Sequence, residues 1–140
     1  MPISKQPDML EELFKKQAEL QDALGYKFNS MSLKERSDYI KEYSQHTDHE
    51  MHEMLQELPY FKGWKRYPED DKEAMHKAYE RAREEMIDAL HFFLNVCIGL
   101  GFTPKQLFAM YMGKHEENYI RQTDTRNYKK CIEEHTNECK

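Results

Sequence analysis

Residues 85–100, EMIDALHFFLNVCIGL, are apolar at most positions and decide the class of fold. Four polar side chains interrupt this run at steps of three, three and four residues: Glu85, Asp88, His91 and Asn95. Such steps place all four along one stripe of an α-helix. A helix that is apolar around most of its circumference is usually buried. We therefore expect a buried helix with an inward-facing polar stripe, the alternative being a salt-bridged or solvent-facing edge.

The composition of the 140-residue chain also favours helices. Leu and Met supply 20 residues, Val and Ile only 7, and Gly and Pro five each. β-Sheets prefer β-branched residues and need frequent turns. The predicted fold is all-α, a bundle of four to five helices, with one domain over residues 1–122 and a polar tail over 123–140. So few aliphatic residues make only a small core within one chain. We therefore expect some apolar surface to be buried against a second copy, in a homodimer.

Charge and cysteine content restrict the partners and the compartment. The formal net charge of −5 argues against binding to nucleic acid or to an anionic membrane surface. The first 20 residues carry no signal-like apolar segment, and the longest apolar run is too short to span a bilayer. Three cysteines without a CxxC pair are typical of free thiols in a reducing compartment. The sequence therefore predicts a cytoplasmic protein with no nucleic-acid or membrane partner.

Helix start and stop signals divide the chain into segments. Ser32-Leu-Lys-Glu35 and Thr47-Asp-His-Glu50 match the capping box, and Gly25 and Pro59 are placed to end helices. Pro104 suits the first position of a helix. The predicted helices are 9–24, 32 to about 43, 47–58, about 69 to 100, and 103–121.

A second group of carboxylates precedes the apolar run. Glu50 and Glu53 lie three residues apart, as do Glu85 and Asp88, so two helices can direct four carboxylates at one point. Carboxylates that close repel one another unless a divalent cation lies among them. Oxygen ligands with few nitrogens favour Mg²⁺ or Mn²⁺. The sequence therefore predicts a metal site, although Glu50 has an alternative role as the acidic partner in the Thr47 capping box.

A cationic group occupies the last predicted helix. Lys114, Asn118 and Arg121 follow one another at steps of four and three residues, mostly along one face. Lys and Arg can bind phosphate oxygens, Arg through two parallel hydrogen bonds. An ordinary charged surface helix has the same pattern, so this interpretation depends on the carboxylates.

Taken together, the motifs resemble those of a known superfamily. Glu50-Met-His-Glu53 and Glu85-Met-Ile-Asp88 are similar to the ExxE and ExxD metal signature of the all-α nucleoside triphosphate pyrophosphohydrolases, which include MazG and the dimeric dUTPases. The segments FKGWKRY, DALHFFLNVCIGLG and YMGKHEENYIRQ resemble the dimeric dUTPases. The resemblance covers residues from about 47 to 122 and extends weakly to the first helix.

The resemblance implies an activity and a role for each matching residue. A homodimer would hydrolyse dUTP or dCTP to the monophosphate with release of pyrophosphate, and the corresponding diphosphates would be further possible substrates. Glu50, Glu53, Glu85 and Asp88 would hold Mg²⁺, and Glu50 or Glu53 would orient or deprotonate the attacking water. Lys114, Asn118 and Arg121 would hold the triphosphate. The residues that would form the base and sugar pocket are Gln17, Gln21, Trp64, His91, Phe92 and Asn95.

Two other functions fit parts of the sequence. His46, His49 and His52 recur every three residues and could form a zinc site, although this spacing turns each imidazole by about 60° from the last. A non-catalytic helical module could bind protein through its Met and aromatic residues, most of which are more simply core. His91 and Trp64 also have plain alternatives as packed core residues, and Cys97 is expected in the core.

Overall fold

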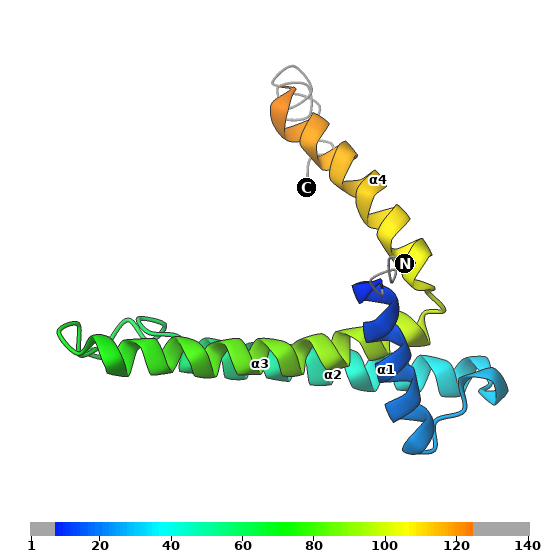
Figure 1. The fold of residues 1–140 in the computed structure, drawn as a ribbon, viewed down its shortest axis with the longest axis horizontal. Coiled ribbons are helices and arrows are strands. Elements are labelled where there is room, and N and C mark those ends of the chain that lie inside the picture. Colours follow the sequence, from blue (N-terminus) through cyan, green and yellow to red (C-terminus); the bar gives the residue numbers. More distant parts are fainter. Residues whose placement is uncertain (1–7, 125–140) are drawn as a thin grey trace, which may run out of the picture. The chain divides into compact units, whose positions relative to one another are not determined.

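The computed structural model describes residues 8–124, and this part of the chain is all-α (Figure 1). Its helices are α1 (Met9–Ala23), α2 (Leu33–Glu57), α3 (Lys72–Gly99) and α4 (Pro104–Thr123), with one turn of 3-10 helix at Phe28–Ser30. The predicted all-α class is therefore confirmed. Nearly all of the predicted tail, together with Cys131 and Cys139, lies outside the described residues.

The chain divides after Phe102 into two compact units, which are described separately. In the first unit, α2 and α3 run side by side along most of their lengths, and α1 packs against α3 (Figure 1). Residues 58–71 connect α2 to α3 and reverse the direction of the chain, so the two helices are antiparallel (Figure 1). In the second unit the described structure is α4.

Helix α2 is continuous where the sequence predicts two helices. Thr47 lies inside α2, and its hydroxyl donates to the carbonyl of Tyr43 at 2.7 Å, so the second predicted capping box is wrong. No Gly or Pro interrupts residues 43–47, and Tyr43 is buried in the helix interface, so packing carries the helix through. Because no helix begins at Thr47, the alternative role of Glu50 as a capping residue is also wrong.

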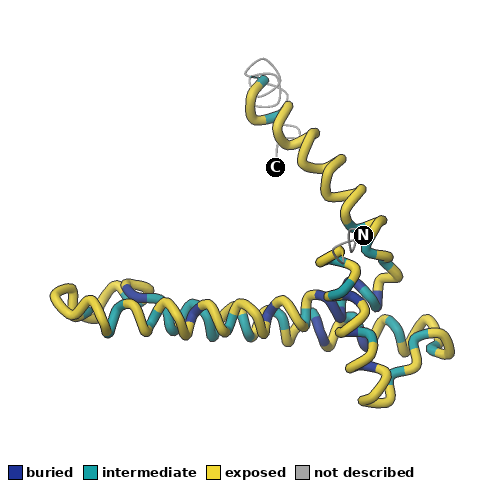
Figure 2. The backbone as a smooth tube through the Cα atoms, viewed as in Figure 1, coloured by how far each residue is buried: buried dark blue, intermediate teal, exposed yellow. Residues whose placement is uncertain are grey.

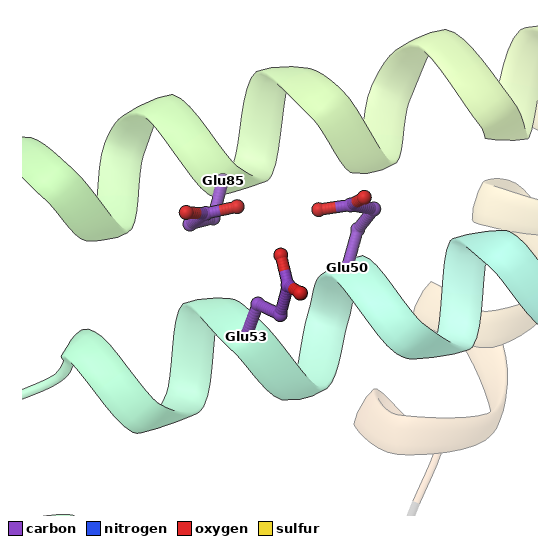
Figure 3. A group of neighbouring side chains, drawn as sticks. All are labelled: Glu50, Glu53 and Glu85. Atoms are coloured by element: carbon purple, nitrogen blue, oxygen red, sulfur yellow. The ribbon is translucent and has the colours of Figure 1, made fainter.

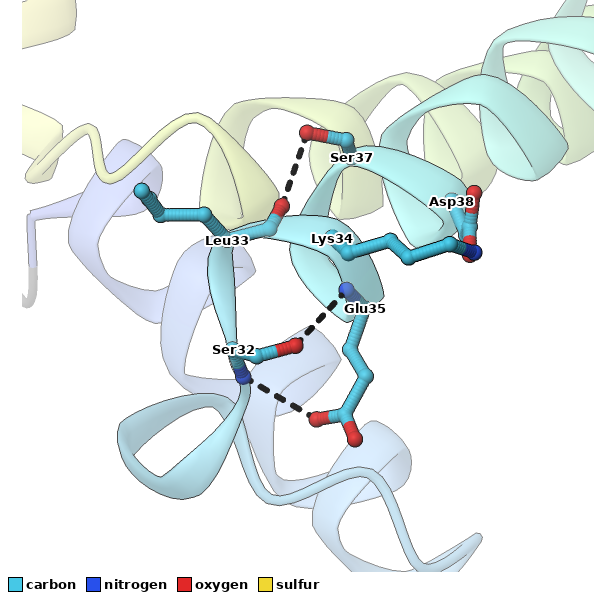
Figure 4. Close-up of polar contacts among 6 residues, drawn as sticks. All are labelled: Ser32, Leu33, Lys34, Glu35, Ser37 and Asp38. Carbon is cyan, nitrogen blue, oxygen red and sulfur yellow. Dashed lines mark hydrogen bonds and ion pairs between the residues drawn. The ribbon is translucent and has the colours of Figure 1, made fainter.

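The other helix ends follow their sequence signals. Ser32 and Glu35 form the predicted capping box, with bonds of 3.1 and 3.0 Å between each side chain and the other residue's backbone N–H (Figure 4). Gly25 and Gly101 adopt φ of +96° and +82° just beyond α1 and α3. At the end of α1, the backbone N–H of Tyr26 donates to the carbonyl of Gln21 at 3.0 Å, as a Schellman motif requires. Helix α3 begins at Lys72 rather than Glu69, because Asp71 caps it.

The core is concentrated where α1, α2 and α3 meet, and most other positions are half-buried or exposed (Figure 2). The buried Tyr39 ring lies 4.5 Å from Tyr43 and 4.9 Å from Phe28, measured between ring centroids. Phe14 and Leu94 are buried here, and so is Cys97, as predicted. This junction fixes the positions of α1 and of the α2–α3 pair.

No single helix in residues 8–124 is long and apolar enough to cross a membrane.

Gly99 is a position where α3 lies against side chains of α2 with no room for a further atom. A Cβ at residue 99 would lie 2.9 Å from Ile40 Cγ1 and 3.1 Å from Tyr39 Cδ1. Overpacking typically costs about 1–3 kcal/mol, and the helix propensity of Ala offsets up to about 1 kcal/mol. We expect Gly99→Ala to lower the free energy of unfolding by about 1–2 kcal/mol in urea titrations.

The matched control is Gly113→Ala, which places the same methyl group in a helix where nothing lies within 4 Å. This variant should keep at least the wild-type helicity and stability. If Gly99→Ala is as stable as wild type, the close contact between α2 and α3 is not as described.

Candidate metal centre

Carboxylates from α2 and α3 converge at the middle of the helix pair. One carboxylate oxygen each from Glu50, Glu53 and Glu85 lies within 4.8 Å of the other two (Figure 3). All three residues are half-buried. In residues 8–124 this is the only group of three or more acidic, His or Cys side chains close enough to share an ion. The predicted pair Glu50 and Glu53 thus meets Glu85, one member of the other predicted pair, across the helix interface.

The helical spacing explains this convergence. Glu50 and Glu53 are three residues apart on the unbroken α2, so both project from one face, and Glu85 faces them from the antiparallel α3 (Figure 3). The second oxygen of Glu50, Oε2, is buried and has no hydrogen-bond partner. A buried anionic oxygen without a partner is costly. The donor set therefore fits a cation that binds oxygen ligands.

The crowding of carboxyl groups changes their acidity. Burial raises the pKa of Glu50 to about 6, and the neighbouring Glu53, Glu85 and Asp88 add to this shift. Burial, followed by the charge of Glu53, also raises the pKa of Glu85. Both shifts mean that the charged forms are disfavoured when nothing positive lies among them.

Asp88 lies at the edge of this group rather than inside it. Its carboxylate is exposed and is not among the three that converge, although its charge contributes to the raised pKa of Glu50. His49, one turn before Glu53, places Nε2 2.9 Å from Glu53 Oε1. His49 was predicted only as a zinc ligand, although its i, i+4 spacing from Glu53 indicates this pair.

The three histidines of the predicted zinc site do not form a group that could share one ion. His46 lies beside Glu42 at 3.5 Å, and His52 beside Gln56 at 3.1 Å, while His49 contacts Glu53. Each imidazole thus interacts with a neighbour on α2 instead of a common centre.

Three residues predicted for the base pocket are brought together in the core. Gln17, Gln21 and Asn95 are each 4% exposed or less. Gln17 Nε2 donates to Asn95 Oδ1 at 2.7 Å, and the hydroxyl of Tyr39 donates to Gln21 Oε1 at 2.9 Å. The amide nitrogen of Asn95 is buried without a partner. Tyr39, which sequence reasoning did not select, is therefore part of this amide group.

The other predicted pocket residues lie elsewhere. Phe92 is half-buried against Tyr43 and His46, with ring centroids 5.8 and 5.4 Å away. His91 is exposed, and its Nδ1 lies 2.9 Å from the carbonyl oxygen of Ile87. Trp64 is 85% exposed on the loop between α2 and α3. The alternatives that placed His91 and Trp64 in the core are therefore wrong.

The predicted inward-facing stripe on α3 is only partly correct. Asn95 is buried and Glu85 half-buried, whereas Asp88 and His91 are exposed. The reason is that α2 covers one side of α3 along most of its length, while α1 adds cover only near Asn95. Away from that junction, the opposite side of α3 faces solvent.

Lys114, Asn118 and Arg121 lie on α4, in the second unit, and all belong to one helix as predicted. Lys114 Nζ is 3.5 Å from Glu117 Oε2, and Arg121 occupies the last turn. Their role in binding phosphate stays a prediction.

Comparison with known proteins gives the class of the chain. A family described as dUTPase matches residues 9–100. A segment of 38 residues is 45% identical to the dCTP pyrophosphatase of Enterobacteria phage LZ5, covering 27% of this chain and 22% of that protein. The chain thus spans about a fifth of this curated relative, and no solved structure matches it.

The protein belongs to the dUTPase family of all-α nucleoside triphosphate pyrophosphohydrolases, because the family match covers more than half of its length. The match to a phage dCTP pyrophosphatase agrees with the resemblance of the chain to the dCTP/dUTP pyrophosphatase of T-even bacteriophages.

The raised pKa of Glu50 predicts how stability depends on pH in the absence of divalent cations. A carboxyl group whose pKa is raised from 4.5 to about 6 by folding binds its proton more tightly in the folded state. The stability that it contributes is present below pH 4.5 and is lost as the pH rises through about 6. In EDTA, Glu50→Gln should lose this part of the pH dependence and be more stable than wild type above that range.

Urea unfolding between pH 4.5 and 7 measures this difference, with the exposed Glu84→Gln as the control that keeps the wild-type slope. Identical slopes for wild type and Glu50→Gln would contradict the crowding of carboxylates around Glu50.

Proposed function

We propose that this protein hydrolyses dUTP, dCTP or both to the nucleoside monophosphate and pyrophosphate, with Mg²⁺ held by the carboxylates of α2 and α3. The observation that carries this proposal is the convergence of Glu50, Glu53 and Glu85 in a member of the dUTPase family. Mn²⁺ is an alternative cation, because it accepts the same oxygen ligands.

The residues fit a divalent cation on chemical grounds. Glu50, Glu53 and Glu85 would hold it through oxygen atoms, and Asp88 lies one turn along α3 from Glu85, where it can join them or bind an associated water. The unpartnered Oε2 of Glu50 supports this assignment. When bound, the cation would neutralise phosphate charge and lower the pKa of a water molecule.

The side chains around the carboxylates would position the reactants. Glu50 or Glu53 would orient the attacking water and accept its proton, and His49, beside Glu53, could receive that proton in turn. The buried amides of Gln17, Gln21 and Asn95 would read the pyrimidine edge, as the family resemblance implies. Lys114, Asn118 and Arg121 would bind the triphosphate. Phosphoryl transfer needs mainly such positioning and charge neutralisation.

Initial rates of pyrophosphate release from dUTP, dCTP, dTTP and dATP, with Mg²⁺ and with EDTA, test the activity. We expect release from dUTP or dCTP that requires Mg²⁺ and is much slower for dATP. Absence of release from all four nucleotides would favour a non-catalytic helical module.

Removing the charge of one predicted ligand should abolish turnover without unfolding the protein. Loss of a group that only supports a metal ligand typically costs 10–100-fold, so Glu53→Gln and Asp88→Asn should each lower kcat by at least about 100-fold. Glu84→Gln, an exposed neighbour on α3, is the control with normal turnover. Near-normal rates for both variants would show that the metal assignment is wrong.

We further propose that the protein acts as a homodimer in the cytoplasm. Met86, Ile87, Leu90 and Phe93 on α3 are each at least 38% exposed, and a surface this apolar is typical of an interface. Sedimentation equilibrium should give twice the 17.0 kDa chain mass. Phe93→Glu should shift the protein toward monomer, and an unchanged mass for this variant would place the interface elsewhere.

A further inference from the structure

A basic pocket lies on the first unit beside the carboxylates. It has a volume of about 260 Å³ and is formed where the loop over residues 59–68 folds back onto the ends of α2 and α3. Lys62, Lys65 and Tyr67 line it from the loop, and Glu57 and Arg81 from the helices. Neither the family match nor the phage relative assigns a role to this pocket.

The charge of the pocket is positive because two of its cations are not neutralised. Arg81 Nε donates to Glu57 Oε2 at 2.7 Å, so this pair cancels. Lys62 and Lys65 form no ion pair within residues 8–124; Lys65 Nζ instead lies 5.8 Å from the centre of the Tyr67 ring. Two lysines that share a pocket repel each other, and an anion between them removes that repulsion.

The loop holds both lysines on one turn. The backbone N–H of Lys62 donates to the hydroxyl of Tyr67 at 3.1 Å, and that of Lys65 to the carbonyl of Lys62 at 3.0 Å. Tyr60 adopts φ of +67°, a conformation that costs a non-glycine residue on the order of 1 kcal/mol, and its ring packs 5.1 Å from Tyr67. The loop is thus a built structure, held in a strained turn by its aromatic residues.

The pocket adjoins the carboxylate group. Glu57 is one helical turn beyond Glu53 on α2, and Arg81 one turn before Glu85 on α3, so each lies about 6 Å further along its helix. Successive phosphates of one chain can therefore reach both the carboxylates and the lysines.

We propose that Lys62 and Lys65 bind the phosphate groups of the polyphosphate substrate on the side of the carboxylates that faces the loop. This inference rests on the proposed function and adds cations from the same unit as the carboxylates. The ligand class is a linear polyphosphate, either the triphosphate of a nucleotide or free pyrophosphate.

Calorimetric titration with inorganic tripolyphosphate, in EDTA and at low salt, tests the pocket without requiring catalysis. The double variant Lys62→Gln/Lys65→Gln should bind at least about tenfold more weakly than wild type, since each charge-assisted bond contributes a factor of this order. Lys62→Arg/Lys65→Arg keeps the charge and should retain binding. Lys72→Gln, an exposed lysine that does not line the pocket, is the control with unchanged affinity.

Steady-state kinetics with dUTP and dCTP then separate nucleotide from free phosphate. An increase of about tenfold in KM with little change in kcat assigns the pocket to the nucleotide. If KM is unchanged and pyrophosphate inhibits wild type more strongly than the double variant, the pocket binds free pyrophosphate.

Equal binding of tripolyphosphate by wild type and the double variant, or no binding by wild type, would overturn the inference. Loss of binding in the double variant of a protein that hydrolyses no nucleotide would instead leave the pocket in place and refute the proposed function.

Discussion

Repulsion between like charges is the constraint on which the interpretation of this structure depends. The antiparallel packing of α2 and α3 brings Glu50, Glu53 and Glu85 together, with Asp88 nearby, and leaves one oxygen of Glu50 without a partner. The helix pair has little core along this stretch, since its fully buried side chains there are small. The packing of α2 against α3 therefore places the carboxylates together, and their repulsion destabilises the folded state. An interface that served only to hold two helices together would avoid this cost.

The three buried amides form a second polar group where α1 packs against the helix pair: Gln17 and Gln21 lie on α1, and Asn95 lies on α3. Asn95 lies ten residues beyond Glu85, about 15 Å along α3. The acidic group and the amide group are thus two separate sites, and α3 contributes a residue to each. Under the proposed function, the first faces the phosphate chain and the second the base. A continuous α2 makes this spacing rigid, because Tyr39, Glu50 and Glu53 all belong to one helix.

The sequence predicted the helices and the acidic group because these depend on local periodicity and on residue type. Capping at Ser32 and the glycine after α1, Gly25, are local signals, and the structure follows them. The break before Thr47 was wrong because its capping signal competed with the burial of Tyr43, which only tertiary packing determines. The exposure of Asp88 and His91 could not be predicted either, since it depends on how far α1 covers α3. Tyr39 was missed because a tyrosine within a predicted helix gives no sign of a hydrogen-bond partner on another helix.

The length and composition of the loop between α2 and α3 are explained by the acidic group and the basic pocket beside it. A long loop of aromatic and basic residues costs conformational entropy, and the strained Tyr60 adds to that cost. A loop that served only to connect two antiparallel helices would need few residues and no clustered charge. Lysine stems bury apolar length while the ammonium groups stay in water, so Lys62 and Lys65 can line a small pocket next to the acidic group. Positive charge at that place lowers the repulsion that a polyphosphate would meet when it approaches the carboxylates, and it does so from within the same packed unit.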